Sequence, residues 1–431
     1  MSGSASALGD VDSSSLANVS ADVLNLAVGH PAACLLPHDL LSQACAAVTP
    51  ARWVLNYGRI AGENSVREAV AAWLASSEHS STVHFGADSR AARPPGRVNA
   101  AEVFITAGVS HGLDSVCAAI ASKGDVAVVV RPTYFLAAGV LRDWGLELVE
   151  VDADEDSGLD VDKLEALLQQ GLRPRIVYAV TTHANPTGRT LTPAARQRLV
   201  QLAQQYRFFI IADEVYQLLS WGQPVPPRMR AYVPPDAEDG GSASTLDVTP
   251  ANCVVSIGSF TKILAPGLRV GWIEAAPSVL ERLSTRGYLV SGGGVTPFAS
   301  QAVREVLTSG GQDAHLASLR AELQRRCDAM CDALRHNAVR AGGWTFTQPQ
   351  GGYFLWLRLP DGMSGAALAA AARTNGVAVL DGATCCANTD GIASTGVANA
   401  GAHVRLCFAY LGTEQIVRGV EKLADAAASL Q

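Results

Sequence analysis

The sequence lacks a long hydrophobic run and carries few charged residues. Over 431 residues, charged side chains make up 17% and hydrophobic ones 48%, and no apolar stretch approaches the roughly 18 residues that a membrane helix needs. The net charge of −7 also argues against a surface that binds nucleic acid or an anionic membrane. We therefore expect a globular chain of two or three structural units that binds neither nucleic acid nor a membrane.

Paired cysteine motifs are absent as well. The nine cysteines are odd in number and contain no CxxC pair, although Cys327 and Cys331 lie one helical turn apart and Cys385 and Cys386 are adjacent. Scattered cysteines of this kind are typical of reduced thiols in a cytoplasmic protein, and we expect no metal site. The first 22 residues have no apolar core and no arginine, so they resemble neither a secretory signal nor a good transit peptide.

One stretch carries an unusual combination of reactive and anion-binding side chains. In SIGSFTKILAPGLRVGW, residues 256–272, Lys262 follows Ser259 and Thr261 and precedes Arg269. An amine beside hydroxyls and a guanidinium suits a phosphorylated aldehyde, because the amine can condense with the aldehyde while the other groups bind phosphate. The stretch therefore points to pyridoxal 5'-phosphate (PLP), although alone it could also be a solvated loop.

Apolar segments alternate with helical patterns through the first two thirds of the chain. Strand-like runs occur at 103–106, 126–130, 146–151, 175–180 and 208–212, with helical spacing at 110–122, 159–168 and after Thr192. This alternation predicts a mostly parallel sheet with right-handed crossovers. A glycine turn at Gly108 feeds the first of these helices, so the amides of Val109 and Ser110 are expected to bind an anion.

Polar and aromatic residues follow three of these strands. Tyr134 comes after 126–130, Asn185 lies in the NPTG turn after 175–180, and Asp213 ends 208–212 with Tyr216 close behind. A carboxylate at the end of an apolar strand needs a partner, which a pyridinium N–H would supply. A helix N-cap is the alternative for Asp213, and an ordinary turn is the alternative for Asn185.

Together these segments resemble the class I/II aminotransferases, the fold-type I PLP enzymes, and in particular the branch of 2-aminoadipate transaminases and the aminotransferase half of MocR regulators. The resemblance runs from about Leu24 to Leu423. It implies an α/β fold with a large domain built on a mostly parallel seven-stranded sheet covered by helices, and a smaller α+β domain. We place an N-terminal tail and arm at 1–45, the large PLP-binding domain at 46–298 and the small domain at 299–431.

The resemblance also implies a role for each matched residue. Lys262 carries the cofactor, Asp213 faces its ring nitrogen, Asn185 and Tyr216 bond its phenolic oxygen, and Tyr134 stacks on the ring. The groups expected to hold phosphate are Val109, Ser110, Ser259, Thr261 and Arg269, joined by Tyr57 from the neighbouring subunit of a homodimer.

Substrate binding is expected to involve the segment at Gly29, together with Asn185 and Arg405. In HVRLCFA, strand alternation places Arg405 on the same face as His403 and Cys407. An arginine there is solvated by default, but in the resembling family it forks the substrate α-carboxylate. No second arginine is assigned to a distal carboxylate; Arg59 and Arg358 are candidates only because they lie near site loops in the sequence.

Three further segments complete the predicted organisation. Residues 344–346, 353–358 and 403–408 are expected to form an antiparallel sheet in the small domain. Residues 80–100 and 224–249 are rich in Pro, Gly and Ser and are expected to be surface insertions.

The predicted activity is transfer of an amino group between an L-amino acid and a 2-oxo acid by a ping-pong mechanism. Elimination, replacement, cyclisation or decarboxylation on the same site is the first alternative, because the site motifs do not distinguish these outcomes. An effector-sensing domain like that of MocR regulators is the second alternative. It is disfavoured, because the short acidic segment ahead of the matched region cannot encode a winged helix.

Overall fold

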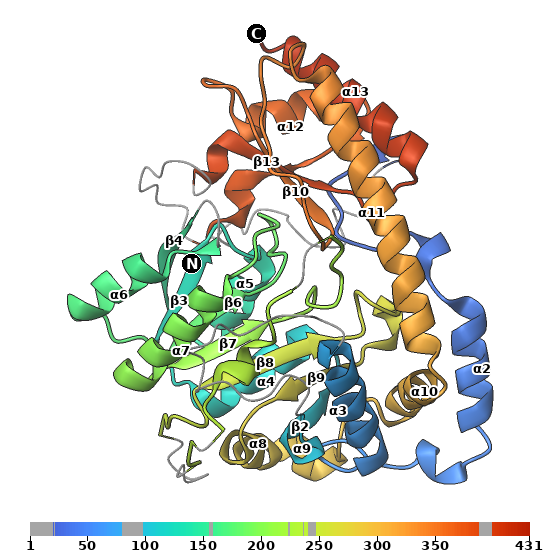
Figure 1. The fold of residues 1–431 in the computed structure, drawn as a ribbon, viewed down its shortest axis with the longest axis vertical. Helices are drawn as coiled ribbons and strands as arrows, with labels where there is room; N and C mark the ends of the chain where they lie inside the picture. The colour runs from blue at the N-terminus through green and yellow to red at the C-terminus, as the bar shows by residue number, and fades with distance from the viewer. Residues whose placement is uncertain are drawn as a thin grey trace, which may run out of the picture.

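A central β-sheet forms the lower body of the molecule, with a smaller unit above it (Figure 1). The computed structural model describes residues 20, 22–79, 98–154, 158–222, 225–235, 237–239, 247–387 and 399–431. The large sheet has the strand order β2-β9-β8-β7-β6-β3-β4-β5. Its strands are β2 (Val103–Thr106), β3 (Val126–Arg131), β4 (Glu147–Asp154), β5 (Gly158–Leu159), β6 (Ile176–Val180), β7 (Phe209–Asp213), β8 (Val254–Ser259) and β9 (Gly271–Glu274).

Burial of both faces explains why these segments form parallel strands. Every residue of β7 and β8 is buried, as expected for apolar runs covered on two sides. Strands β4, β3, β6, β7 and β8 pair in parallel, and β9 runs antiparallel between β8 and β2. Seven strands match the predicted sheet; the eighth, β5, is a two-residue strand that pairs antiparallel with the end of β4.

Helices cover the sheet as the sequence pattern predicts. Helix α4 (Val109–Ile120) matches the helical spacing predicted at 110–122, and its apolar stripe of Leu113, Val116, Cys117 and Ile120 is buried. Helix α7 begins with Pro193 after Thr192, whose hydroxyl accepts the N–H of Ala195 at 3.2 Å. The helices of this body are α3 (Asn64–His79), α4 (Val109–Ile120), α5 (Phe135–Asp143), α6 (Val161–Gln169), α7 (Pro193–Tyr206), α8 (Pro277–Ser284), α9 (Gly287–Gly292) and α10 (Pro297–Thr308).

In the part of the upper unit that the structure describes, there are a three-stranded antiparallel sheet and three α-helices. Its strands are β10 (Phe354–Arg358), β12 (Leu380–Asp381) and β13 (His403–Cys407), and its helices are α11 (Gly311–Asn337), α12 (Gly365–Thr374) and α13 (Thr413–Ala428). The prediction of a strand at 344–346 was wrong, since only Thr345 makes a bridge, to Arg358. Trp344 instead donates its indole N–H to Leu334 O of α11 at 2.9 Å, which holds this segment against the helix.

The N-terminal arm contacts both units. Strand β1 (Leu24–Asn25) pairs in parallel with β11 (Val377–Ala378) of the upper unit, whereas α2 (His38–Val48) packs on α10. The domain boundaries at 45 and 298 therefore stay predictions. Among the described residues, no helix is long and apolar enough to cross a membrane.

The two predicted insertions have different outcomes. Most of 80–100 lies outside the described residues. The prediction of a surface insertion at 224–249 was wrong for its first part, because residues 226–233 are buried. This segment can enter the interior because its arginines are paired there: Arg228 forms an ion pair with Glu274, and Arg230 forms one with Glu102.

Candidate active site

A cavity opens at one edge of the large sheet. Strands β2, β3, β6, β7 and β8 all run toward this edge, and ligands of open α/β sheets bind outside the carboxyl ends of the strands. The lining contains twelve of the thirteen predicted site residues: Gly29, Val109, Ser110, Tyr134, Asn185, Asp213, Tyr216, Ser259, Thr261, Lys262, Arg269 and Arg405. Residues predicted from separate motifs thus meet in one place.

Tyr57 is the predicted residue that does not line the cavity. Its side chain is 83% exposed, and it precedes Gly58, which bridges to Gly294. Within one chain it has no part in the site, so its role stays a prediction that depends on a second subunit.

Lys262 lines the cavity, and its amine is hydrogen-bonded to the N-terminal arm. Its Nζ donates to Gly29 O at 2.8 Å, and its backbone oxygen accepts the hydroxyl of Tyr353 at 2.8 Å. Burial lowers the pKa of Lys262 to about 8. A lysine with a lowered pKa has a larger fraction of neutral amine near pH 7, which is the nucleophilic form.

Asp213 faces the same cavity from the end of β7 and is 2% exposed. Burial raises the pKa of its carboxyl to about 6, and the Tyr178 hydroxyl, which donates to Oδ2 at 2.7 Å, opposes that rise. The N–H of Val215 approaches Oδ1 at 3.4 Å, but no α-helix begins there. The N-cap alternative therefore fails, and the carboxyl is arranged for a cationic or N–H partner in the cavity.

An anion cradle lies where α4 begins. No side chain caps this helix, so its first N–H groups are directed at the cavity edge. Gly108 has a φ of 85°, and a Cβ on it would come within 2.8 Å of Arg269 Nη2, so the guanidinium lies directly against the turn. The Ser259 hydroxyl donates to Thr261 Oγ1 at 2.8 Å on the same side. Backbone amides, two hydroxyls and one guanidinium suit a phosphate dianion.

Arg405 also lines the cavity. Its Nη1 donates to Asn185 Oδ1 at 2.8 Å and its Nη2 to Ala27 O at 2.6 Å. Its Nε is buried and has no hydrogen-bond partner among the described residues. The guanidinium carbon lies 4.1 Å from the centre of the Phe354 ring. A fixed guanidinium with an unused N–H in a cavity is a suitable site for a carboxylate.

Sequence reasoning missed several residues that shape this site. Tyr178 sits on β6 with nothing in its local sequence to mark it as the donor to Asp213. Of the two aromatics in GGYF, Phe354 lines the cavity, and a Cβ on Gly29 would come within 2.7 Å of its Cζ; Tyr353 instead supports Lys262. The two glycines before them match a family segment that approaches the substrate side chain, so the sequence marked this segment but assigned a role to neither aromatic. His30 also lines the mouth of the cavity.

Three polar residues near the site loops in the sequence lie outside the cavity lining. Arg59 and Arg358, the candidates for a distal carboxylate, have side chains 67% and 54% exposed. His183 is buried, with its Nε2 2.5 Å from Ser220 Oγ, and burial lowers its pKa to about 3. His183 is therefore a neutral structural residue of the loop that carries Asn185.

This chain is similar in sequence and in fold to known aminotransferases. The family profile described as "Aminotransferase class I and II" matches residues 21–423. The aromatic-amino-acid aminotransferase 1 of Thermococcus litoralis is 32% identical over 412 residues, covering 94% of this chain and 88% of that protein. The solved multiple substrate aminotransferase of Thermococcus profundus superposes with a TM-score of 0.80 at 28% identity, covering 96% of this chain and 93% of that one.

A second solved structure of similar fold contains a pyridoxyl-phosphate derivative. LysN, the α-aminoadipate aminotransferase of Thermus thermophilus, was solved in complex with N-(5'-phosphopyridoxyl)-L-leucine. It superposes with a TM-score of 0.77 at 26% identity and covers 97% of each chain.

The fold and the family match define the class: this chain belongs to the class I and II aminotransferase family of fold-type I enzymes. The protein is accordingly an aminotransferase, and the predicted fold class and activity are confirmed. These findings favour amino-group transfer over elimination, decarboxylation or effector sensing.

Proposed function

We propose that this protein uses PLP to move the amino group of an L-amino acid to a 2-oxo acid in two successive half-reactions. The observation that carries the proposal is the meeting, in one cavity, of a lysine amine, a buried carboxyl, an anion cradle and a partly unpaired arginine. Each of these groups matches one part of the cofactor or of an amino acid.

The residues present fit PLP. The α4 amides of Val109 and Ser110, with Ser259, Thr261 and Arg269, would hold its phosphate, and Asp213 would face its ring nitrogen. Tyr134 would stack on the ring, with Asn185 and Tyr216 at the phenolic oxygen. When bound, PLP supplies a carbonyl that exchanges amino groups and a ring that accepts electron density.

Residues of the chain itself have separate roles in the proposed reaction. The free N–H groups of Arg405 bind the substrate α-carboxylate and orient the amino acid. The Lys262 amine, with its pKa of about 8, would take the proton from the substrate Cα and deliver it to C4′ of the cofactor. Phe354 and Tyr216 cover the cavity wall and exclude water from the reacting atoms.

The amino donor is proposed to carry a neutral, apolar or aromatic side chain. Apart from Arg269 and Arg405, no arginine lies among the cavity residues that the structure describes, and those two are assigned to phosphate and α-carboxylate. Apolar groups such as Val28, Leu136 and Phe354 line much of the rest. The name of the Thermococcus litoralis relative, an aromatic-amino-acid aminotransferase, agrees with this choice.

The test is a half-reaction. PLP-loaded protein is mixed with one L-amino acid at a time and no oxo acid, and the absorbance of the bound cofactor is followed. Conversion to the amine form, with release of an equimolar 2-oxo acid, is expected for phenylalanine and leucine and much less for aspartate. Release of ammonia or CO₂ without the amine form would contradict the transfer reaction; equal conversion of aspartate would contradict only the donor preference.

A homodimer with shared sites is part of the proposal. Tyr57, Trp53, Leu55, Tyr288 and Val290 are exposed large hydrophobic side chains, an arrangement that a second copy of the chain would cover. Light scattering is expected to give twice the 44.9 kDa chain mass, and Tyr57→Phe is expected to weaken PLP binding about tenfold, since one hydrogen bond to a charged group contributes about 1.5–3 kcal/mol. A fully active monomer would refute this arrangement.

A cytoplasmic location is also proposed, because none of the nine cysteines is paired.

A further inference from the structure

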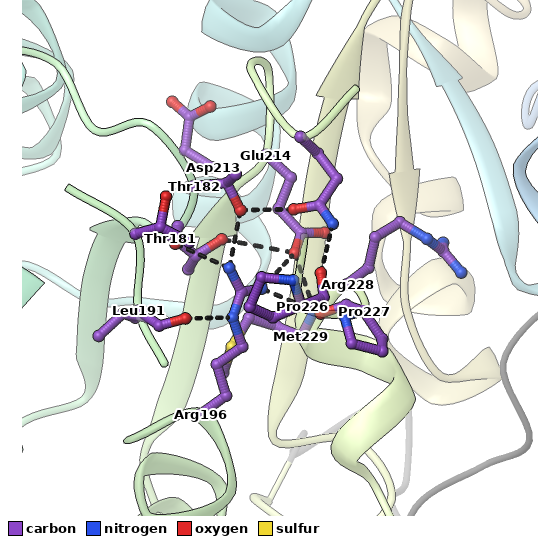
Figure 2. A network of polar contacts seen from close by, with 12 residues as sticks. Thr181, Thr182, Leu191, Arg196, Asp213, Glu214, Pro226, Pro227, Arg228 and Met229 are labelled. Atoms are coloured by element: carbon purple, nitrogen blue, oxygen red, sulfur yellow. Dashed lines mark hydrogen bonds and ion pairs between the residues drawn. The ribbon is translucent and has the colours of Figure 1, made fainter. Parts of the chain in front are cut away.

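A buried arginine outside the cavity makes an unusual number of contacts. Arg196 of α7 is fully buried, at 0% exposure. Its Nε donates to Leu191 O at 3.0 Å, its Nη1 to Pro227 O at 3.0 Å, and its Nη2 to Thr181 O at 2.8 Å and Thr182 Oγ1 at 2.7 Å. Figure 2 shows the guanidinium surrounded by groups from segments that are far apart in the sequence.

Those contacts clamp the loop that carries Asn185 from both of its ends. Thr181 and Thr182 begin this loop at the end of β6, and Leu191 ends it before α7. The first and the last residues of the loop are therefore bound to the same guanidinium. Asn185 lies between the two attachment points and contacts Arg405 in the cavity.

The same guanidinium reaches the neighbour of Asp213. Arg196 Nη1 lies 3.6 Å from Glu214 Oε1, which also accepts the N–H of Met229 at 2.8 Å. Glu214 is buried; burial raises its pKa, and Arg196 and then Arg228 oppose that rise. The N–H of Thr181 meanwhile donates to Asp213 O at 3.3 Å. In Figure 2 the Asp213 carboxyl points away from the guanidinium. The bond from Thr181 therefore holds the backbone of Asp213, and the carboxyl still faces the cavity.

The geometry suits arginine and no other side chain. The planar guanidinium presents five N–H donors in a fixed fork, and the four hydrogen bonds and one ion pair above approach it from several directions. A lysine has three donors on a single nitrogen and cannot span the same acceptors. A methionine would leave Glu214 as a buried carboxylate without its nearest cation, which is costly.

We propose that Arg196 is a positioning residue that joins the Asn185 loop and the Asp213–Glu214 segment into one rigid unit, so that cofactor binding depends on a side chain that lines no part of the cavity. The dependence on PLP rests on the function proposed above. The coupling of the two segments does not.

Hydrogen exchange of the cofactor-free protein tests the coupling. In Arg196→Lys, amides of 181–191 and 213–217 are expected to exchange at least tenfold faster than in the wild type. Arg230→Lys is the matched control, because Arg230 is equally buried and bonds Glu102 and Ala251 O but lies outside the cavity lining. It is expected to speed exchange around residues 229–233, where the Met229 N–H bonds Glu214, and to leave the amides of 181–191 unchanged. Acceleration of only one segment in Arg196→Lys, or of neither, would overturn the proposal.

Cofactor affinity tests the consequence. Arg196→Lys is expected to bind PLP at least tenfold more weakly and to shift the pH midpoint of the bound cofactor's absorbance, whereas Arg230→Lys should change neither. A double variant, Arg196→Met with Glu214→Gln, removes the uncompensated charge. If it recovers wild-type affinity, the effect of Arg196 is electrostatic and the positioning role is refuted; persistent weak binding supports it. Wild-type protein that binds no PLP would refute the proposed function and leave the exchange result to decide the coupling.

Discussion

Lys262→Ala is expected to abolish the half-reaction with every amino donor. The substitution removes the amine that we propose bonds the cofactor and moves the substrate proton, and loss of a positioned general base alone lowers rates by about 10²–10⁴-fold. We therefore expect turnover to fall by at least that factor. The absorbance of lysine-bound cofactor should disappear, although the cradle around Arg269 can still bind PLP noncovalently.

The control for this prediction is Lys123→Ala. The chain has four lysines, and Lys123 is exposed and lies outside the cavity lining. Its replacement should leave spectrum and rate unchanged. Borohydride reduction of the PLP-loaded wild type, followed by peptide mass spectrometry, should place the cofactor on Lys262. Attachment at another lysine, or turnover retained by Lys262→Ala, would refute the assignment.

Arg405→Lys is expected to lower kcat/KM for the amino donor by about 10²-fold, since each hydrogen bond to a charged group contributes about 1.5–3 kcal/mol. The lysine keeps the positive charge but loses the fork that meets two carboxylate oxygens, and it also loses the bonds to Asn185 and Ala27 O. The loss should appear mainly in KM, because the carboxylate is bound before and during the chemistry.

Arg358→Lys provides the matched comparison. Arg358 lies on β10, the strand that pairs with β13, but it is more than half exposed and lies outside the cavity. Steady-state kinetics of that variant should equal those of the wild type. Simple amines without a carboxylate should react at similar rates with the wild type and with Arg405→Lys. If Arg405→Lys keeps wild-type KM for amino acids, the substrate carboxylate binds elsewhere.

The parts of the site that the sequence predicted are those that depend on local chemistry. Asp213 ends an apolar strand, Asn185 lies in a turn that follows one, and Gly108 starts a helix without a cap. Parallel strands bring their carboxyl ends together, so such positions converge whatever the distant packing. For this reason the prediction could gather residues from widely separated motifs in one cavity.

The parts that it missed depend on which distant side chains become neighbours. Tyr178 follows the same apolar pattern as its strand, and its bond to Asp213 arises only from the pairing of β6 with β7. Residues 226–233 have the composition of a surface loop but are buried, because Arg228 and Arg230 find acidic partners far along the chain. Arg196 has the sequence context of an ordinary exposed helical residue. Local patterns carry no information on such pairings.

The short strand β1 gives the cavity two independently anchored halves. Through β1 and β11, and through the bond from Cys407 N to Leu26 O, the arm that presents Gly29 is fastened to the same upper sheet as Arg405. The groups proposed to face the phosphate and the ring nitrogen belong to the lower sheet. A swing of one sheet relative to the other would widen or narrow the gap between substrate and cofactor. It would also have to break or remake the bonds from Lys262 Nζ to Gly29 O and from Arg405 to Asn185, which join the two halves.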